Sequence, residues 1–309
     1  MEKLTQYPEF KKIVDLISAQ NPLQRKQINN FTNMQDEDYW EYAESICRRI
    51  NLSLLQSEQE MAEAASSYNR MTMDFLREQI RFSKTGIYCP DDARSAEQNV
   101  YSQPGVMRYY MVGLFLSYLL WPNHFEIIRF FKDYLKEAPA VERYLEIAPG
   151  HGLFAVEAIR RFPGLDATLL DISETSIRVT SEILAAFQAA PPRLRFINGD
   201  FLSVPIEGND FDFISMGEVL EHVHDPAGFL GRACRLLRRR GAIFMSTCAN
   251  CPAIDHVYNF RNADEIRDVI RSSGLSIVKD KVLPVEIMSE EQRKEGMAAI
   301  NYCSILIKE

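Results

Sequence analysis

The stretch Arg143-Tyr144-Leu145-Glu146-Ile147-Ala148-Pro149-Gly150-His151-Gly152 decides the fold that we expect for this chain. A strand pattern ends in a turn with two glycines one residue apart, and residues 153–159 then show the apolar spacing of a helix that packs on a sheet. Gly150 and Gly152 lack a side chain, so a ligand can approach the main chain closely there. The stretch therefore predicts a strand, a glycine turn and a helix that together form a nucleotide cradle.

Two further acids lie where such a cradle needs them, at the ends of strand patterns. Asp171 closes the run 167–171 and lies 21 residues after Gly150, where its carboxylate can accept hydrogen bonds from both ribose hydroxyls. A third strand pattern, 194–197, leads to Asp200 and Phe201, which offer an acceptor to an exocyclic amine and a flat apolar wall to a purine. The glycine spacing alone also fits a dinucleotide-binding turn, so the nicotinamide oxidoreductases stay open at this point.

Four motifs in order resemble those of the class I S-adenosylmethionine-dependent methyltransferases, and the resemblance runs from about Glu126 to Glu309. The motifs are Leu145-Glu146-Ile147-Ala148-Pro149-Gly150-His151-Gly152, Leu170-Asp171-Ile172-Ser173, Asn198-Gly199-Asp200-Phe201 and Phe211-Asp212-Phe213-Ile214-Ser215-Met216-Gly217-Glu218-Val219-Leu220-Glu221-His222-Val223. The chain departs from the family at Ala148, which stands where the family has its first glycine.

The resemblance implies a cofactor, S-adenosylmethionine, and a role for each matching residue. Glu146 is expected near the methionine amino group, directly or through water, and the main chain of Ala148, Gly150 and Gly152 along the methionine moiety. The second motif implies that Asp171, with Ile172 beside it, holds the ribose. Asp200 and Phe201 are expected to bind the adenine.

The strand patterns predict an α/β fold, a doubly wound, seven-stranded Rossmann-like sheet. Five strands are expected to alternate with helices, and the last two to form an antiparallel hairpin, an ending typical of the family; the ranges are 143–148, 167–170, 194–197, 211–216, 242–247, 275–285 and 302–308. A nicotinamide-binding domain would instead continue in parallel fashion. We expect residues 125–309 to form the methyltransferase domain.

Residues 1–124 carry no strand pattern and predict an all-helical region. Helices are expected over 10–18, 37–55, 57–82 and 105–120, separated by breaks at Asn-Pro, 86–90 and 102–104. The helices are rich in aromatic residues, which can build a substrate lid or a homodimer interface as well as a core. Tyr109 and Tyr110 are adjacent, so at most one of them is expected to point at the active site.

Composition limits the classes of function. The chain has 309 residues, of which 46% are hydrophobic and 25% charged, and its net charge is −8. This acidity argues against a protein that depends on contacts with nucleic-acid phosphates. The longest apolar run, 111–121, is shorter than the roughly 20 residues that span a bilayer, and no leader pattern opens the chain, so we expect a cytoplasmic protein without a membrane span.

Two short patterns are assigned structural roles. Arg238-Arg239-Arg240 is expected to end a helix over 227–237, with Gly241 as the stop. The six scattered cysteines predict reduced thiols. Cys248 and Cys251 form a lone C-x-x-C, which fits a redox-active pair or half of a zinc site, but no second pair with finger spacing exists. We expect the two thiols to line a loop at the mouth of the active site.

The segment after the fourth strand pattern contains the candidate acceptor chemistry. Glu218, Glu221 and His222 are spaced i, i+3 and i+4, so they share one face if Glu218 opens a helix. His256 is expected on the same rim of the sheet. This set resembles the metal-dependent branch of the family, such as the small-RNA 2′-O-methyltransferases and the ubiquinone-pathway O-methyltransferases, which implies that these four residues bind Mg²⁺ or a similar ion.

Without a metal, His222 or His256 is the expected general base, and His256 is preferred. His124, expected in a linker, His151 and His224 are assigned structural roles. We expect methyl transfer to a small-molecule hydroxyl oxygen, with N- or C-methylation as alternatives. A catalytically degenerate binding protein of the same fold is the other alternative.

Overall fold

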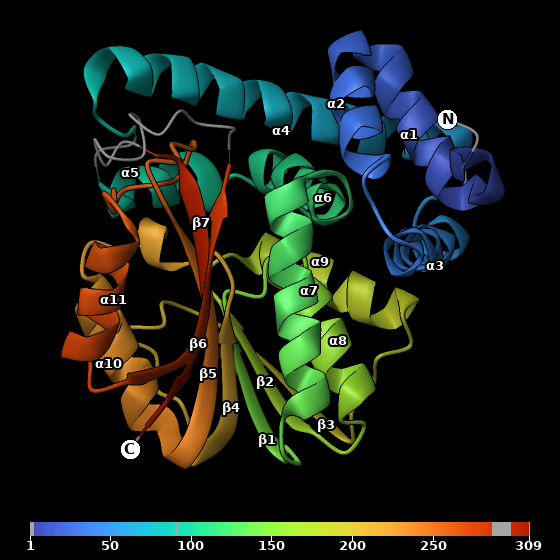
Figure 1. Cartoon of the computed structure of the whole chain (residues 1–309). Helices are drawn as coiled ribbons and strands as arrows, with labels where there is room; N and C mark the ends of the chain where they lie inside the picture. The colour runs from blue at the N-terminus through green and yellow to red at the C-terminus, as the bar shows by residue number, and fades with distance from the viewer. Residues whose placement is uncertain (1–2, 90–91, 286–297, 309) are drawn as a thin grey trace.

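The structure, a computed structural model, describes residues 3–89, 92–285 and 298–308. Its first part is helical, as expected (Figure 1). The elements before the sheet are η1 (Lys3–Gln6), α1 (Pro8–Gln20), α2 (Pro22–Thr32), α3 (Glu37–Ser53), α4 (Glu58–Thr85), α5 (Ala93–Ala96), the π-helical turn η2 (Glu97–Tyr101), α6 (Pro104–Leu120) and α7 (Pro122–Glu137).

Local signals explain where these helices begin and end. Proline occupies the first turn of α1, α2, α6 and α7, where its missing N–H leaves no helical hydrogen bond unmade. Ser57 and Glu60 form a capping box at the start of α4, and Gly86 ends that helix at φ 67°. All four predicted helices are confirmed. The sequence reading missed α2, whose buried apolar side chains are Ile28 and Phe31 alone, too few for a clear period.

His124 does not lie in a linker, which corrects the sequence reading. It sits in the first turn of α7, is 6% exposed, and its Nδ1 lies 2.7 Å from the Ser117 hydroxyl of α6. Burial lowers the pKa of His124 to about 3, and the neighbouring His151 adds to this shift, so the ring is neutral. The expected domain boundary between residues 124 and 125 therefore falls inside a helix.

The sheet has seven strands in the order β3-β2-β1-β4-β5-β7-β6. The strands are β1 (Arg143–Ile147), β2 (Asp166–Asp171), β3 (Arg193–Asn198), β4 (Phe211–Met216), β5 (Leu237–Ala249), β6 (Ser276–Pro284) and β7 (Ile300–Ile307). β3, β2, β1, β4 and β5 are parallel, and β7 is antiparallel to both β5 and β6. The predicted Rossmann-like sheet with its terminal antiparallel hairpin is confirmed; residues 286–297 of that hairpin lie outside the described residues.

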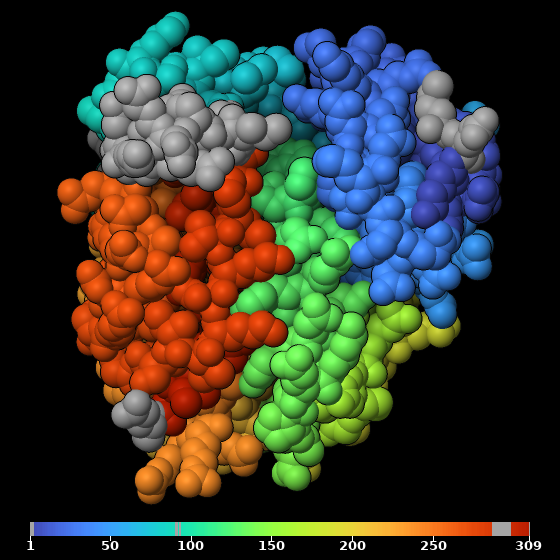
Figure 2. All heavy atoms as spheres, viewed as in Figure 1, coloured from blue at the N-terminus to red at the C-terminus, as the bar shows by residue number. Residues whose placement is uncertain are grey.

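Helices cover both faces of the sheet because its side chains alternate (Figure 1). Tyr144, Phe213 and Phe244 belong to the core that includes α7, α8 (Leu153–Arg161), α9 (Glu174–Ala186) and the N-terminal helices. Leu145 and Ile243 belong to a second core, under α10 (Pro226–Leu236) and α11 (Ala263–Ser272). Figure 2 shows α7, in green, along the surface between the C-terminal strands and the N-terminal helices.

The arginine run 238–240 does not end a helix, which is a second correction. α10 stops at Leu236, and the three arginines occupy the exposed start of β5, where Arg238 forms an ion pair of 2.8 Å with Asp212. The cations had suggested a helix end, but Leu237 and Ala242 on either side of the run pair with β4, and the Arg240 N–H binds the Lys308 carbonyl at 3.2 Å. The run is therefore an irregular stretch within the start of the strand. Within the described residues, no helix is both long and apolar enough to cross a membrane.

Candidate functional site

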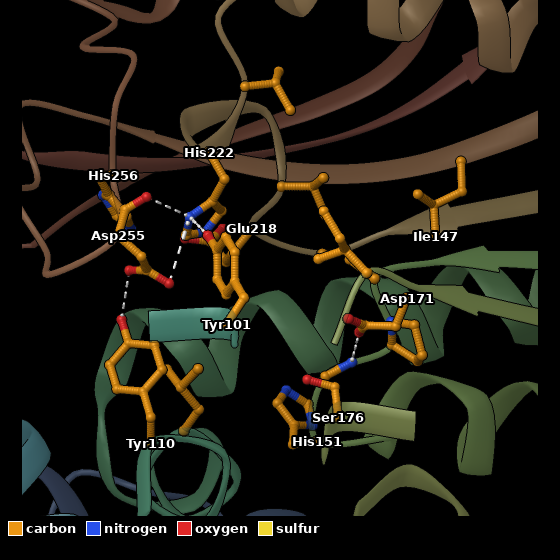
Figure 3. A pocket seen from close by; sticks show the side chains of 18 of the residues that line it. Tyr101, Tyr110, Ile147, His151, Asp171, Ser176, Glu218, His222, Asp255 and His256 are labelled. Carbon is orange, nitrogen blue, oxygen red and sulfur yellow. Dashed lines mark hydrogen bonds and ion pairs between the residues drawn. The ribbon is translucent and has the colours of Figure 1, made fainter. Parts of the chain in front are cut away.

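A cavity of about 750 Å³ lies where the parallel strands end at their carboxyl side, and α6 forms its opposite wall. Its lining comes from the loops after β1, β2, β3, β4 and β5 and from α4, η2, α6 and α7. Open α/β sheets bind ligands at this edge, and the volume is in the usual range for a small-molecule site. Figure 3 shows side chains from both halves of the chain converging on it.

The glycine turn after β1 has three residues with positive φ at alternate positions: Ala148 at 54°, Gly150 at 54° and Gly152 at 74°. Ala148 and Gly150 line the cavity. Gly152 is not among the lining residues. A Cβ on Gly152 would lie 3.1 Å from Thr180, so this glycine lets α8 pack closely on α9. Within the turn, Ala148 and Gly150 thus face the cavity, whereas Gly152 serves the packing of α8 on α9.

Asp171 lies at the end of β2, lines the cavity and connects the strand to the glycine turn. Its carboxylate accepts the N–H of Ser173 at 2.8 Å and the N–H of Gly150 at 3.3 Å. Burial raises the pKa of Asp171 to about 6, although these two hydrogen bonds oppose the shift. Each oxygen keeps a further lone pair for a ligand hydroxyl. Ile172, beside it, is 40% exposed and also lines the cavity.

Glu146 lies in β1 and is not among the residues that line the cavity. It is 1% exposed, and Tyr144 donates its hydroxyl to Oε2 at 2.6 Å. Burial raises the pKa of Glu146 to about 8, a shift that the tyrosine hydrogen bond opposes. Its described hydrogen bond is thus within β1, and the expected place of Glu146 near the methionine amino group stays a prediction.

The predicted adenine residues Asp200 and Phe201 both line the cavity. Phe201 is 4% exposed and packs against Phe229 of α10, with ring centroids 4.6 Å apart. Asp200 is exposed and accepts the N–H of Leu202 at 2.9 Å. A fixed ring beside an accessible carboxylate fits the face and the amino edge of a purine.

At the other end of the cavity, the predicted helix face of Glu218, Glu221 and His222 does not form. The turn there is a three-residue 3₁₀ helix, η3 (Leu220–His222), and Glu218 precedes it at φ 53°. The Glu218 N–H binds Ser246, and Asn301 donates to its Oε2 at 2.6 Å. These contacts with β5 and β7 hold Glu218 in the left-handed conformation and prevent a regular helix from starting there.

His222 is held in one orientation by partners from two distant segments (Figure 3). Its Nδ1 lies 3.0 Å from the main-chain oxygen of Asp255, 2.9 Å from the Tyr101 hydroxyl and 3.6 Å from the Asp255 carboxylate. A carbonyl oxygen can only accept, so Nδ1 is the donor in this contact and Nε2 is the nitrogen left to meet a ligand. Tyr110 donates its hydroxyl to the same carboxylate at 3.0 Å.

His256 lies beside His222, with ring centroids 4.8 Å apart and the planes nearly perpendicular. Its Nδ1 donates to the main-chain oxygen of Cys251 at 2.6 Å. His256 is 6% exposed, and burial lowers its pKa to about 3, with His222 adding to the shift. The ring is therefore neutral. Both histidines line the cavity.

The four residues predicted to bind Mg²⁺ do not come together as one set. Among the described residues, the metal-capable groups are Glu221, Cys248 and His256, and separately His222, Asp255 and His256, each with ligand atoms within 4.8 Å of one another. Glu218 belongs to neither group, because Asn301 and Ser246 hold it elsewhere. The Mg²⁺ set of two carboxylates and two imidazoles stays a prediction, since neither group holds all four residues.

The sequence analysis missed three residues at the end of the cavity around His222, which we call the acceptor end: Asp255, Tyr101 and Tyr110. Asp255 precedes His256, but nothing in the spacing links it to His222. Tyr101 is the last residue of the π-helical turn, and the apolar spacing of the sequence did not predict this turn. For the pair in α6, the prediction that at most one tyrosine points at the site is confirmed: Tyr110 lines the cavity and Tyr109 does not.

Comparisons with known proteins agree with this geometry. The family described as "Methyltransferase domain" matches residues 145–245. The ubiquinone biosynthesis O-methyltransferase of Paracidovorax citrulli is 30% identical over 180 residues, 52% of this chain and 74% of that protein. The ubiquinone/menaquinone biosynthesis C-methyltransferase of Dinoroseobacter shibae is 29% identical over 40% of this chain, which spans half of that relative's length.

A solved structure shares the fold of this chain. Phosphoethanolamine N-methyltransferase 2 of Haemonchus contortus, in complex with phosphomonomethylethanolamine and S-adenosylhomocysteine, aligns with a TM-score of 0.51 at 14% identity. The alignment covers 70% of this chain and 60% of that chain. At this identity the likeness concerns the fold alone.

Proposed function

Because the chain belongs to the class I S-adenosylmethionine-dependent methyltransferases, we propose that it transfers the cofactor's methyl group to a hydroxyl oxygen of a small, largely apolar acceptor. The observation that carries the proposal is the position of His222 at the end of the cavity away from the glycine turn, where Asp255 and Tyr101 hold Nδ1 and leave Nε2 for the acceptor. A hydroxyl must lose its proton as it attacks the methyl carbon, and a neutral imidazole can accept that proton.

The cofactor supplies an activated methyl group on a sulfonium. The chain's own residues would hold it: the main chain at Ala148 and Gly150 against the methionine moiety, Asp171 at the ribose, and Asp200 with Phe201 at the adenine. These residues lie on one wall and His222 on another, so acceptor and donor can be aligned between them. In a displacement of this type, alignment provides much of the rate acceleration.

The acceptor end is apolar and aromatic, which supports a flat or hydrocarbon-rich substrate. Side chains from α4, α6 and the residue after α6 contribute to it; they are Phe75, Met107, Tyr110, Leu114 and Trp121. The relatives named for O- and C-methylation in quinone biosynthesis support the same class of acceptor, a hydroxylated aromatic ring.

The arrangement does not need a metal for proton removal. His222 takes that role directly, with Asp255 and Tyr101 as positioning residues. We therefore expect turnover to persist after treatment with a chelator of Mg²⁺, whereas abolition by the chelator and recovery with Mg²⁺ would return the acceptor chemistry to the metal-dependent branch.

The test is product identification. The protein is incubated with methyl-labelled S-adenosylmethionine and a panel of phenols, catechols, matched anilines and quinols with a free ring carbon. We expect label on oxygen, identified by mass spectrometry. Label on nitrogen or carbon would replace the oxygen assignment. Cofactor binding in calorimetry without transfer to any acceptor, including a metabolite extract, would favour a degenerate binding protein.

A further inference from the structure

The C-x-x-C pair at the end of β5 lies at the acceptor end of the cavity, and the proposed methyl transfer does not use it. Cys248 and Cys251 are free thiols and both line the cavity. The sequence contains no second pair with finger spacing that would complete a zinc site with them. The structure brings other ligand-bearing side chains to one of them.

Three ligand types meet around Cys248. Glu221 from η3, Cys248 from β5 and His256 from the following loop offer an oxygen, a sulfur and a nitrogen within 4.8 Å of one another. All three residues are buried, at 0%, 1% and 6% exposure. Carboxylate, thiolate and imidazole are the three protein ligands of Zn²⁺, and a three-residue set leaves a fourth position open.

An independent observation points to a bound cation. Glu221 Oε1 is buried without a hydrogen-bond partner, while Thr247 donates to Oε2 at 2.6 Å. An orphaned oxygen on a fully buried carboxylate is costly, and a bound cation beside it would offset that cost. Cys248 Sγ makes only long contacts, 3.7 Å from His256 Nδ1 and 3.8 Å from the Cys251 oxygen.

The surroundings of His256 also match those of a metal ligand. Its Nδ1 donates to the Cys251 carbonyl at 2.6 Å, which fixes the ring and leaves Nε2 with the lone pair. A ligating histidine is typically held in this way by a carbonyl or carboxylate on its other nitrogen. Cys251 thus contributes its main chain to the arrangement.

We propose that Glu221, Cys248 and His256 bind one thiophilic divalent cation, such as Zn²⁺, with an open coordination position toward the cavity. Cys248 and His256 both line that cavity, which gives the fourth ligand access. This site differs from the magnesium site expected from the sequence, since it replaces Glu218 and His222 by a thiolate. A sulfur ligand selects Zn²⁺ or Co²⁺ against Mg²⁺. The proposal does not depend on the proposed methyl transfer.

The experiment measures metal binding in the absence of cofactor and acceptor. Chelator-treated, reduced protein is titrated with Zn²⁺ and, in parallel, with Co²⁺, while metal content is measured by mass spectrometry and the cobalt spectrum is recorded. We expect one equivalent of either ion and a thiolate-to-cobalt charge-transfer band. Excess Mg²⁺ should not compete.

Four variants locate the site. Cys248→Ser should lower Zn²⁺ affinity by about 100-fold or more and remove the band, and Glu221→Gln should lower affinity by about 10-fold or more. Cys303→Ser, at another buried thiol, and Glu218→Gln should bind like the wild type. Circular dichroism and thermal melting establish that each variant is folded.

Three results would overturn the proposal: no ion bound by the wild type, cobalt bound without the charge-transfer band, or unchanged affinity in folded Cys248→Ser. Loss of binding in Glu218→Gln together with competition by Mg²⁺ would also overturn it, in favour of the oxygen-rich site. If Cys248→Ser does not fold, the wild-type cobalt spectrum and Glu221→Gln still decide.

Discussion

The two ends of the cavity are built in different ways. The cofactor end is made by short, contiguous segments, each a strand and the turn that follows it: 145–152, 170–173 and 198–201. The acceptor end is assembled from η2, α6, η3 and the loop after β5, and its hydrogen bonds join residues as far apart as Tyr110 and Asp255. Under the proposed assignment, local chain geometry would recognise the nucleoside and tertiary packing would recognise the acceptor.

This difference separates two kinds of effect that substitutions should have. Changes at the cofactor end should act on cofactor affinity, because the groups there form binding contacts. Changes at the acceptor end should act on turnover, because the groups there are proposed to hold or move a proton.

The largest effect is expected for His222→Gln. The amide keeps a polar group but cannot accept the acceptor's proton, so turnover should fall by about 100- to 10,000-fold with unchanged cofactor affinity. Initial rates with labelled cofactor and calorimetric titration measure the two quantities. His224→Gln, at an exposed histidine two residues along, is the matched control and should keep most of the activity. Wild-type turnover in His222→Gln would remove this residue from the mechanism.

The next effect concerns acid stability at the wall formed by α6 and α7. His124 has a folded pKa of about 3, below its unfolded value of about 6.5, so the unfolded chain binds a proton that the folded chain rejects. Above pH 6.5, His124 does not lower the free energy of unfolding. As the pH drops from 6.5 toward 3, protonation of the unfolded chain lowers that free energy by on the order of 4 kcal/mol for this group.

His124→Asn should therefore move the midpoint of acid unfolding to lower pH, as followed by circular dichroism. His224→Asn, which changes an exposed histidine, should leave the midpoint near that of the wild type. Equal midpoints for the wild type and His124→Asn would mean that the ring is protonated in the folded state.

At the cofactor end, Asp171→Ala should weaken S-adenosylmethionine binding by about 1–3 kcal/mol, the cost of unmade hydrogen bonds. Asp166→Ala is the matched control, since Asp166 begins the same strand and forms an ion pair with Arg195 instead. Calorimetry measures both affinities. An unchanged affinity in Asp171→Ala would end the assignment of this carboxylate to the ribose.

The smallest effect is expected for Ala148→Gly. Alanine at φ 54° carries about 1–2 kcal/mol of strain, and glycine would relieve it at a cost of about 0.5–1 kcal/mol in chain entropy. Denaturant unfolding should show a gain of up to about 1 kcal/mol, with unchanged cofactor affinity. A loss of stability would show that the alanine methyl group makes packing contacts worth more than the strain.

The sequence predicted the sheet well because its signals are local. β4 was predicted over 211–216 and observed over the same residues, since buried parallel strands are continuous apolar runs with sharp ends. The start of β5 was missed because the polar run Arg238–Arg240 has the composition of a helix end, whereas the pairing of the flanking Leu237 and Ala242 with β4 places the run within the strand.

The acceptor end shows why the remainder could not be predicted. The spacing of Glu218, Glu221 and His222 favours one helix face, but Ser246 and Asn301 hold Glu218 at a positive φ. Both partners lie on strands far along the chain. The contact between His222 and Asp255 likewise exists only after the loop beyond β5 has folded back over η3.

The position of β7 has a consequence for how the chain matures during synthesis. This strand leaves the ribosome after every other strand of the sheet, yet it is an interior strand, paired with both β5 and β6. Until it docks, the nascent protein exposes an open strand edge, which is a risk for aggregation. Asn301, which positions Glu218 and binds Asn123, arrives with the same strand, so the acceptor pocket takes its final shape only at the last step of sheet assembly.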